Sequence, residues 1–273
     1  MNRVLVTGGS SGLGAALVEA YAARGAQVLN CDLSVSSVVE EVAQQPSRNP
    51  GATDLRLDVR SDDDWAAAVA WVEEHWGGLD VLVNNAGVAG GGRIDVATMA
   101  EWQQITEINL FGVVRGTRTF VPVFKRQRSG RIVNVASLAG LVHPAGMGSY
   151  NAVKAGVVAF TETIGHELAE YGVTAHAVCP SYFRTGLVDA MQGSDEAVGA
   201  VIGELVANAP LGPAEIAQAV LEALDRGDEL ILPDEAARRA YRLKLADRAA
   251  YDDVMRKQAA HLTALRPQKE EDQ

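Results

Sequence analysis

The sequence predicts a single-domain α/β fold: a doubly wound parallel sheet of about seven strands with helices on both faces. Two observations carry this prediction. Short runs rich in Val, Leu and Ile alternate with longer stretches of helical periodicity up to about residue 233, and such alternation is typical of βαβ units. Most of the short runs are apolar at successive positions, as expected of strands buried between two layers of helices.

The predicted elements follow in order along the chain. The strands are expected at residues 4–7, 27–31, 54–57, 79–84, 131–136, 173–179 and 229–232. Two helix starts have the spacing of a capping box, Ser61 with Asp64 and Thr98 with Glu101. Long helices are predicted near residues 98–126 and 149–171.

The predicted organisation is one large domain followed by a helical extension. We expect the domain over residues 1–233, including a loop without a strand at residues 181–212. Residues 234–266 are predicted to form a charged helical extension and residues 267–273 a frayed tail. Residues 44–52 contain two prolines and a glycine, which is typical of a surface loop.

Composition and charge argue against several classes of protein. The 273 residues are 48% hydrophobic and 22% charged, which is typical of a folded globular chain. The formal net charge of −11 would repel a nucleic-acid backbone, so we expect no nucleic-acid partner. No apolar run approaches the roughly 20 residues needed to cross a bilayer, and the N-terminal residues do not resemble a signal peptide.

Cysteines and histidines add two expectations. Cys31 and Cys179 lie in apolar runs far apart in the sequence, which predicts buried free thiols in a reducing compartment, and hence a cytoplasmic protein. The five histidines show no spacing typical of metal ligands, so we expect no catalytic metal.

A glycine-rich turn lies between the first predicted strand and the first predicted helix. It runs Thr7-Gly8-Gly9-Ser10-Ser11-Gly12-Leu13-Gly14. Glycines here let the backbone turn tightly and set a helix N-terminus against a phosphate. A P-loop is not favoured because no Lys-Ser or Lys-Thr pair follows, and a plain strand-to-helix turn is the alternative. The turn indicates a Rossmann-type dinucleotide site.

Asp32, at the end of the second predicted strand, favours NAD(H) over NADP(H). Its carboxylate can accept hydrogen bonds from ribose hydroxyls and would repel a 2′-phosphate. Ser11 and Leu33 are not basic, so neither position offers a cation to a phosphate. The alternative is that Asp32 only caps a helix.

Further motifs, in order along the chain, resemble those of the short-chain dehydrogenase/reductase family, in its branch of about 250 residues. Besides the glycine turn they are Asp58-Val59, Asn84-Asn85-Ala86-Gly87, Asn109, Ser137 and Tyr150-Asn151-Ala152-Val153-Lys154. The resemblance implies an oxidoreductase whose cofactor site comprises Gly8, Ser10, Ser11, Gly12, Leu13, Gly14, Asp32, Leu33, Asp58, Val59, Asn85, Ala86, Gly87, Tyr150, Lys154, Pro180, Phe183 and Thr185. The sequence departs from the family at Ser181, where glycine more often follows the proline.

Four residues are predicted to be catalytic: Asn109, Ser137, Tyr150 and Lys154. Tyr150 and Lys154 are four residues apart, so on a helix they share a face, and a nearby ammonium favours the phenolate. We expect Tyr150 to act as the acid/base and Ser137 to hold the substrate oxygen. The resemblance implies that Asn109 bends its helix and holds a water molecule that links Lys154 to solvent. Taken singly, a core tyrosine, a surface lysine and a capping serine are the alternatives.

The loop at residues 181–212 is predicted to contact the substrate. Its first part is apolar through Tyr182, Phe183, Leu187, Val188 and Met191, which favours a bulky or alicyclic secondary alcohol or its ketone. Packing of these side chains on the protein itself is the alternative.

Two other residues near these motifs are assigned no role in the reaction. His143 lies between Ser137 and Tyr150 and could face the substrate or be an ordinary loop histidine. Cys179 is expected to be inert because no activating base lies nearby in the sequence.

The basic stretch in the extension is predicted to be a solvated face. It comprises Arg238, Arg239, Arg242, Lys244 and Arg248, and a membrane-surface or oligomer contact is the alternative. The family resemblance implies a homotetramer, or a dimer, formed through the two long helices.

Three functions remain open at this stage. The leading one is an NAD-dependent oxidoreductase acting on a secondary alcohol or ketone. An NADPH-dependent ketoreductase of the same fold is the near alternative. A non-catalytic dinucleotide sensor is the third, although such a protein would have no need for the Tyr-Lys pair.

Overall fold

The computed structural model describes residues 2–35, 51–186 and 193–265. Most of the predicted surface loop at 44–52 and the whole predicted tail at 267–273 lie outside the described residues. The same holds for Leu187, Val188 and Met191 of the predicted substrate loop.

Seven parallel strands form one sheet in the order β3-β2-β1-β4-β5-β6-β7. They are β1 (Arg3–Thr7), β2 (Gln27–Asp32), β3 (Ala52–Arg56), β4 (Val81–Asn84), β5 (Gly130–Val135), β6 (Val173–Val178) and β7 (Leu230–Ile231). The predicted fold class is confirmed, and each predicted strand is present with its ends shifted by at most two residues. The order reverses between β1 and β4, so their carboxyl ends open onto the crevice where such sheets bind ligands.

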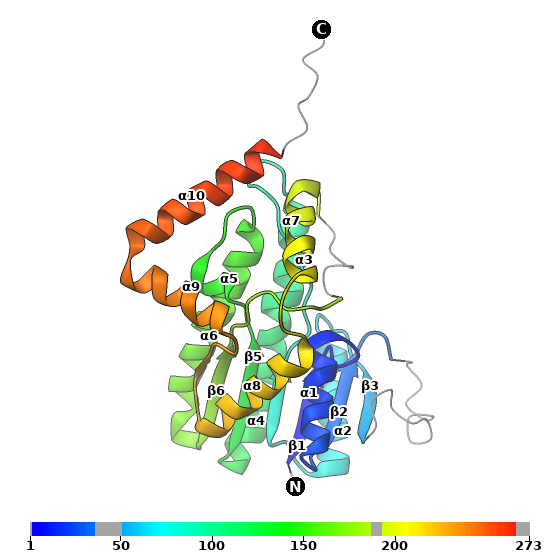
Figure 1. Ribbon diagram of the computed structural model, residues 1–273. Coiled ribbons are helices and arrows are strands. Elements are labelled where there is room, and N and C mark those ends of the chain that lie inside the picture. The colour runs from blue at the N-terminus through cyan, green and yellow to red at the C-terminus, as the bar shows by residue number, and fades with distance from the viewer. Residues whose placement is uncertain (1, 36–50, 187–192, 266–273) are drawn as a thin grey trace.

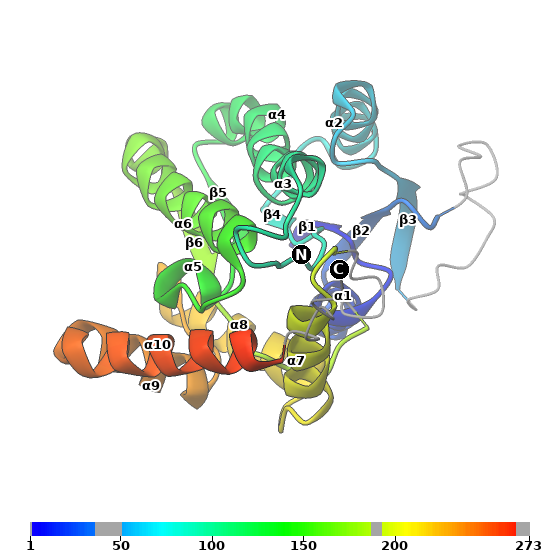
Figure 2. The same ribbon diagram turned by 90° about the horizontal axis from the view of Figure 1, so that it is seen from above.

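Helices cover both faces of the sheet. The α-helices are α1 (Gly12–Ala23), α2 (Asp62–Trp76), α3 (Met99–Thr106), α4 (Gly112–Gln127), α5 (Ala139–Val142), α6 (Gly148–Leu168), α7 (Glu196–Ala207), α8 (Pro213–Arg226), α9 (Glu235–Ala246) and α10 (Arg248–Ala264). Figure 2 shows α2, α4 and α6 on one face and α1 and α8 on the other. Each face encloses its own buried apolar cluster, which explains why the strands are apolar on both sides.

The predicted helix ends are largely confirmed. Ser61 accepts a hydrogen bond from the Asp64 amide, and Thr98 and Glu101 form the reciprocal capping box. The predicted helix near 98–126 is interrupted, because a π-helical turn, η1 (Glu107–Phe111), separates α3 from α4. The helix predicted near 149–171 is α6, with a final 3-10 turn η2 (Ala169–Tyr171).

The extension after β7 consists of α9 and α10, which pack across α5 and α6 (Figure 1). Tyr251 of α10 is buried in one cluster with Leu141, Val142 and Val157. None of the helices within the described residues is both long enough and apolar enough to cross a membrane.

The basic stretch is only partly a solvated face. The guanidinium groups form surface ion pairs where they have a partner: Arg238 and Arg242 with Glu235, and Arg248 with Asp252. Lys244 is different, because its ammonium donates to the carbonyl oxygen of Leu141 and lies 2.9 Å from Nδ1 of His143. That lysine fastens α9 to the end of α5.

Candidate active site

The glycine turn is shaped for close approach of a ligand to the backbone. Gly8 and Gly12 have φ values of +65° and +52°, and a Cβ atom at Gly14 would lie 2.0 Å from the carbonyl oxygen of Gly8. Ser11 precedes α1 without capping it through its side chain. The Ser11 hydroxyl therefore does not occupy the first amides of α1, which is what a pyrophosphate site at this helix N-terminus requires.

The turns after β1 and β4 are joined by hydrogen bonds. Thr7 Oγ1 accepts from the amides of Asn85 and Ala86, both at 3.0 Å. Asn85 Nδ2 donates in return to the carbonyl oxygens of Thr7 and Gly8, at 2.9 and 3.2 Å. These bonds hold the predicted Asn85-Ala86-Gly87 segment against the glycine turn. Thr7 belongs to the predicted motif, but sequence reasoning assigned it no role.

Asp32 lies beside the same turn. One carboxylate oxygen accepts from the Ser10 amide at 3.1 Å, and the other accepts from the amide and hydroxyl of Ser34. Leu33 is 54% exposed next to it. Arg56 is the register partner of Asp32 in the adjacent strand, and its guanidinium is paired with Asp64 at 3.1 Å.

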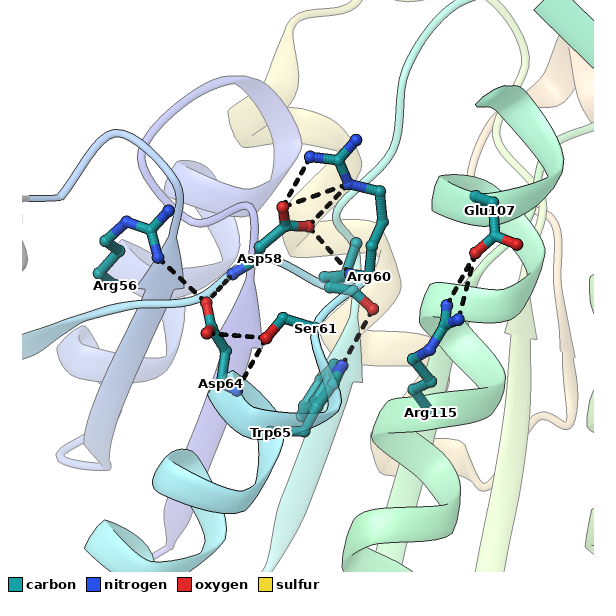
Figure 3. A network of polar contacts seen from close by, with 9 residues as sticks. Arg56, Asp58, Arg60, Ser61, Asp64, Trp65, Glu107 and Arg115 are labelled. Carbon is teal, nitrogen blue, oxygen red and sulfur yellow. Dashed lines mark hydrogen bonds and ion pairs between the residues drawn. The ribbon is translucent and has the colours of Figure 1, made fainter. Parts of the chain in front are cut away.

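Asp58 follows β3 and belongs to a polar network (Figure 3). Its amide donates to Asp64, while its carboxylate is bound by the Arg60 guanidinium at 2.6 to 3.2 Å. Hydrogen bonding to Arg60 holds the pKa of the Asp58 carboxyl below its usual range. The carbonyl oxygen of Val59 accepts from Trp65 Nε1 at 3.1 Å, which fixes the backbone of this part of the predicted cofactor site. The role of Arg60 was not predicted.

Asn109 lies in the π-helical turn and is fully buried. Its side chain bonds both backbone groups of Val88: Nδ2 donates to the carbonyl oxygen at 2.9 Å and Oδ1 accepts from the amide at 2.8 Å. A π-helical turn stands at the position where the family resemblance implies a bend. The side chain also fastens η1 to the segment that follows β4.

Tyr150 and Lys154 lie in the first part of α6 and share a face, as their spacing predicts. The Lys154 ammonium is buried, donates to the carbonyl oxygen of Val135 at 2.9 Å and lies 5.7 Å from the centre of the Tyr150 ring. Burial lowers the pKa of Lys154 to about 8. The lysine is therefore not an ordinary surface residue.

Burial also sets the protonation of Tyr150. It raises the pKa of the phenol to about 12, although hydrogen bonding with Ser137 acts in the opposite direction. We expected the pKa to be lowered by Lys154, and in this structure desolvation is the larger effect. Ser137 Oγ additionally accepts from the Ala139 amide at 3.1 Å, so this serine also stabilises the turn after β5.

A buried row of polar side chains lies beneath the site, and sequence reasoning singled out only its first member, Asn84, as part of a family motif. Asn84 Nδ2 donates to Asn134 Oδ1 at 2.8 Å, and Asn134 Nδ2 donates to Thr161 Oγ1 at 2.9 Å. The row links β4, β5 and α6, which carry the candidate catalytic residues or the loops next to them. For Asn134 the sequence signal was a polar residue within an otherwise apolar strand.

The segment after β6 crosses from the sheet to the glycine turn. The carbonyl oxygen of Pro180 accepts from the Leu138 amide at 2.9 Å. Phe183 packs against the cluster under α1, and a Cβ atom at Gly12 would lie 2.9 Å from Thr185 Oγ1. Thr185 is thus brought next to the glycine turn, as the predicted cofactor site requires.

Ser181, the departure from the family pattern, has a partner in the extension. Its amide and hydroxyl donate to the two carboxylate oxygens of Asp234 at 2.9 and 2.6 Å. Asp234 is buried and also caps α9 by accepting from the Ala237 amide. The serine therefore stabilises the turn through a contact that glycine could not make with a side chain.

His143 and Cys179 were assigned no role in the reaction, and their surroundings fit that expectation. His143 is exposed and bonded to Gly140 and Lys244, which fits an ordinary loop histidine. Burial raises the pKa of Cys179 to about 12, which disfavours a reactive thiolate. Among the described residues, no group of three or more His, Cys, Asp or Glu side chains could hold a metal ion.

One side of Tyr150 is apolar. Tyr150 and Tyr182 pack against a buried cluster formed by Met147, Val198, Ile202, Val206 and Leu262. The Tyr182 hydroxyl donates to the Met147 sulfur at 3.5 Å. This environment suits a hydrocarbon substituent beside the reacting carbon.

A Rossmann-type sheet with a glycine turn at its switch point, and beside it a tyrosine paired with a buried lysine, defines a dinucleotide-dependent oxidoreductase. The profile of the short chain dehydrogenases matches residues 2–196. The chain belongs to the short-chain dehydrogenase/reductase family, which uses a nicotinamide dinucleotide.

Relatives with different named activities resemble the chain to a similar degree. It is 34% identical over 216 residues to a 3-oxoacyl-(acyl-carrier-protein) reductase of Vibrio cholerae, covering 79% of this chain and 86% of the relative. It is 32% identical over 218 residues to a cyclopentanol dehydrogenase of Comamonas sp., covering 80% and 87%.

Among solved structures, a short chain dehydrogenase/reductase from Burkholderia phymatum in complex with NAD matches with a TM-score of 0.81 and 29% identity. The match covers 91% of this chain and 94% of that one.

Proposed function

We propose that the protein is an NAD(H)-dependent oxidoreductase that interconverts a bulky or alicyclic, apolar secondary alcohol and its ketone. The observation that carries the proposal is Tyr150, which meets Ser137 and Lys154 on one side and an apolar cluster on the other. The resemblance to a cyclopentanol dehydrogenase supports an alicyclic substrate.

The proposed cofactor site combines the glycine turn, Asp32, Asp58-Val59, Asn85-Ala86-Gly87 and the segment from Pro180 to Thr185. The backbone cradle around Gly8, Gly12 and Gly14 fits a dinucleotide because these positions have no room for a side chain. A Cβ atom there would lie 2.9 Å from Ala86 Cα, 2.9 Å from Thr185 Oγ1 and 2.0 Å from the Gly8 carbonyl oxygen, respectively. A bound nicotinamide would supply or accept the hydride. Preference for NAD(H) rests on the Asp32 carboxylate, the exposed Leu33 beside it and the pairing of Arg56 with Asp64.

In the proposed mechanism Ser137 holds the substrate oxygen and Tyr150 exchanges the proton with it. Lys154 places a cation beneath the phenol ring, where it stabilises the negative charge that develops on Tyr150 in alcohol oxidation. Asn109 holds η1 in place and thereby keeps the segment after β4 beside the site. It acts as a positioning residue in this scheme.

A reductase of the same fold that prefers NADPH is the second candidate. The raised pKa of Tyr150 favours ketone reduction over alcohol oxidation, because a protonated phenol is ready to donate to a carbonyl oxygen. The resemblance to a 3-oxoacyl reductase points the same way. The cofactor preference separates the two candidates.

The test is a panel of linear, alicyclic and polyol alcohols with NAD⁺ and NADP⁺, together with the corresponding ketones and NADH or NADPH. We expect turnover on one substrate class with NAD(H), and a loss of at least about 100-fold in Tyr150→Phe. A fluorescence titration of that variant with NADH separates loss of the chemical step from loss of the cofactor. Tight NADH binding without turnover on any substrate would instead favour a dinucleotide sensor.

We also propose a cytoplasmic homotetramer, with a dimer as the alternative, built from a catalytic domain over residues 1–233 and an extension at 234–266. Two buried free cysteines support a reducing compartment. Phe111, which is 44% exposed beside α4, supports association through the long helices.

A further inference from the structure

The last turn of α10 reaches the apolar cluster beside Tyr150. Leu262 is 2% exposed and belongs to the buried cluster on which Tyr150 and Tyr182 pack. A Cβ atom at Gly146 would lie 2.8 Å from Leu262 Cδ1, so the leucine touches the segment that leads into α6. Figures 1 and 2 both show this end of α10 beside α7.

Arg93 holds that turn in place. Its Nη1 donates to the carbonyl oxygen of Leu262 at 3.0 Å, one of the last carbonyls of α10. Its backbone amide, Nε and Nη2 all donate to the Asp195 carboxylate, at 2.7 to 2.9 Å. Asp195 is buried and caps α7. One arginine therefore joins the segment after β4, the start of α7 and the end of α10.

The other end of the extension is held as well. Asp234, which begins α9, binds the amide and hydroxyl of Ser181. Ser181 opens the predicted substrate loop, and Asp195 starts the helix that occupies its second half. The extension is thus attached at both ends to the segments that flank the site.

We infer that the end of α10 is a fixed wall of the substrate pocket and that Leu262 limits the size of the substrate. The inference rests on the proposed function. Leu262, Val198, Ile202 and Met147 present hydrocarbon, and the charges of Arg93 and Asp195 neutralise each other, so the substituent facing this wall is uncharged and apolar. A shorter side chain at position 262 would admit a larger ring.

The experiment measures kcat/KM for cyclohexanone and for the larger bicyclic ketone 2-decalone, with NADH, in wild type and in Leu262→Ala and Leu262→Phe. We expect Leu262→Ala to raise the ratio for the larger over the smaller ketone about tenfold and Leu262→Phe to lower it, since a few methylene groups in an apolar pocket change selectivity on this scale. Leu245→Ala removes a leucine that is 69% exposed in the same extension and is the matched control. In Leu245→Ala the ratio of kcat/KM for the larger over the smaller ketone should equal that of wild type.

A second variant tests whether the contacts of Arg93 with Asp195 and Leu262 hold the end of α10 in place. Arg93→Gln alone would leave the Asp195 carboxylate buried and unpaired, and the chain could fail to fold. Combined with Asp195→Asn it leaves a neutral pair that retains an oxygen to cap α7. We expect this double variant to shift selectivity toward 2-decalone, as Leu262→Ala does.

The outcomes separate the inference from the proposed function. If wild type reduces the ketones and the ratio of kcat/KM for 2-decalone over cyclohexanone is unchanged in both Leu262 variants, the inference about α10 is overturned and the proposed function is unaffected. A wild type that reduces none of the ketones would overturn the proposed function. In that case the role of Leu262 is tested by measuring how much each ketone raises the melting temperature of the NADH complex. A larger rise with 2-decalone in Leu262→Ala than in wild type supports the inference, and equal rises in the two proteins overturn it.

Discussion

Burial governs the two side chains proposed to move the proton. Desolvation raises the pKa of Tyr150 to about 12 and lowers that of Lys154 to about 8. Both shifts favour the neutral forms, because a charge in an apolar surrounding loses its hydration. At neutral pH the phenol keeps its proton, while the lysine still carries its charge.

The pH dependence follows from these directions. Between pH 6 and 8, below the pKa of Lys154, alcohol oxidation needs the rare phenolate of Tyr150, so its kcat/KM should rise about tenfold per pH unit. Ketone reduction needs the abundant phenol and should be nearly flat. Initial rates in both directions across this range test the prediction, and a flat oxidation profile would mean that the pKa of Tyr150 lies below 6.

Cofactor preference should depend on Asp32 and its neighbour. Replacing the carboxylate and adding a cation, in Asp32→Ala with Leu33→Arg, should raise the affinity for NADPH relative to NADH, because a 2′-phosphate would then meet attraction in place of repulsion. Fluorescence titrations with both cofactors measure it. Leu33→Ala is the matched control, and an unchanged preference in the double variant would contradict the role of Asp32.

At the scale of single elements, the π-helical turn depends on one side chain. Asn109→Ala removes both hydrogen bonds to the Val88 backbone and leaves these groups without their partner. We expect a loss of about 2 to 4 kcal/mol in the free energy of unfolding. Urea titration measures it, with the exposed Gln104→Ala of α3 expected within about 0.5 kcal/mol of wild type.

Two helical glycines should respond in opposite ways to the same substitution. A Cβ atom at Gly116 of α4 would lie 2.4 Å from Asn84 Oδ1 and 2.6 Å from Trp65, so Gly116→Ala should destabilise the protein by about 1 to 3 kcal/mol. At Gly165 of α6 the nearest atom would be at 3.8 Å, and Gly165→Ala should stabilise by about 0.5 to 1 kcal/mol. Urea midpoints of the two variants check both signs, and equal shifts would show that close packing at Gly116 is not decisive.

For the whole molecule, the proposed tetramer predicts a particle of about four times the 28.9 kDa chain mass. Multi-angle light scattering after size exclusion measures this directly. Phe111→Glu places a charge on the exposed apolar position beside α4, and it should shift the particle toward smaller species. A wild-type particle of twice the chain mass would establish the dimer instead.

The extension ties the whole molecule together through contacts between residues distant in sequence. Arg93 meets Asp195 and Leu262, and Ser181 meets Asp234. Each contact joins the domain or its substrate loop to another part of the chain. None follows a spacing that a local pattern could reveal.

The sequence by itself determined the seven strands, the glycine turn and the candidate catalytic residues, because these depend on local periodicity and on motifs of a few residues. The π-helical interruption at Asn109, the buried row from Asn84 to Thr161 and the partner of Ser181 were decided only by tertiary structure. The raised pKa of Tyr150 belongs with them, since burial depends on every element packed around the phenol. Spacing placed Lys154 near Tyr150, but only the fold determined how much water surrounds the pair.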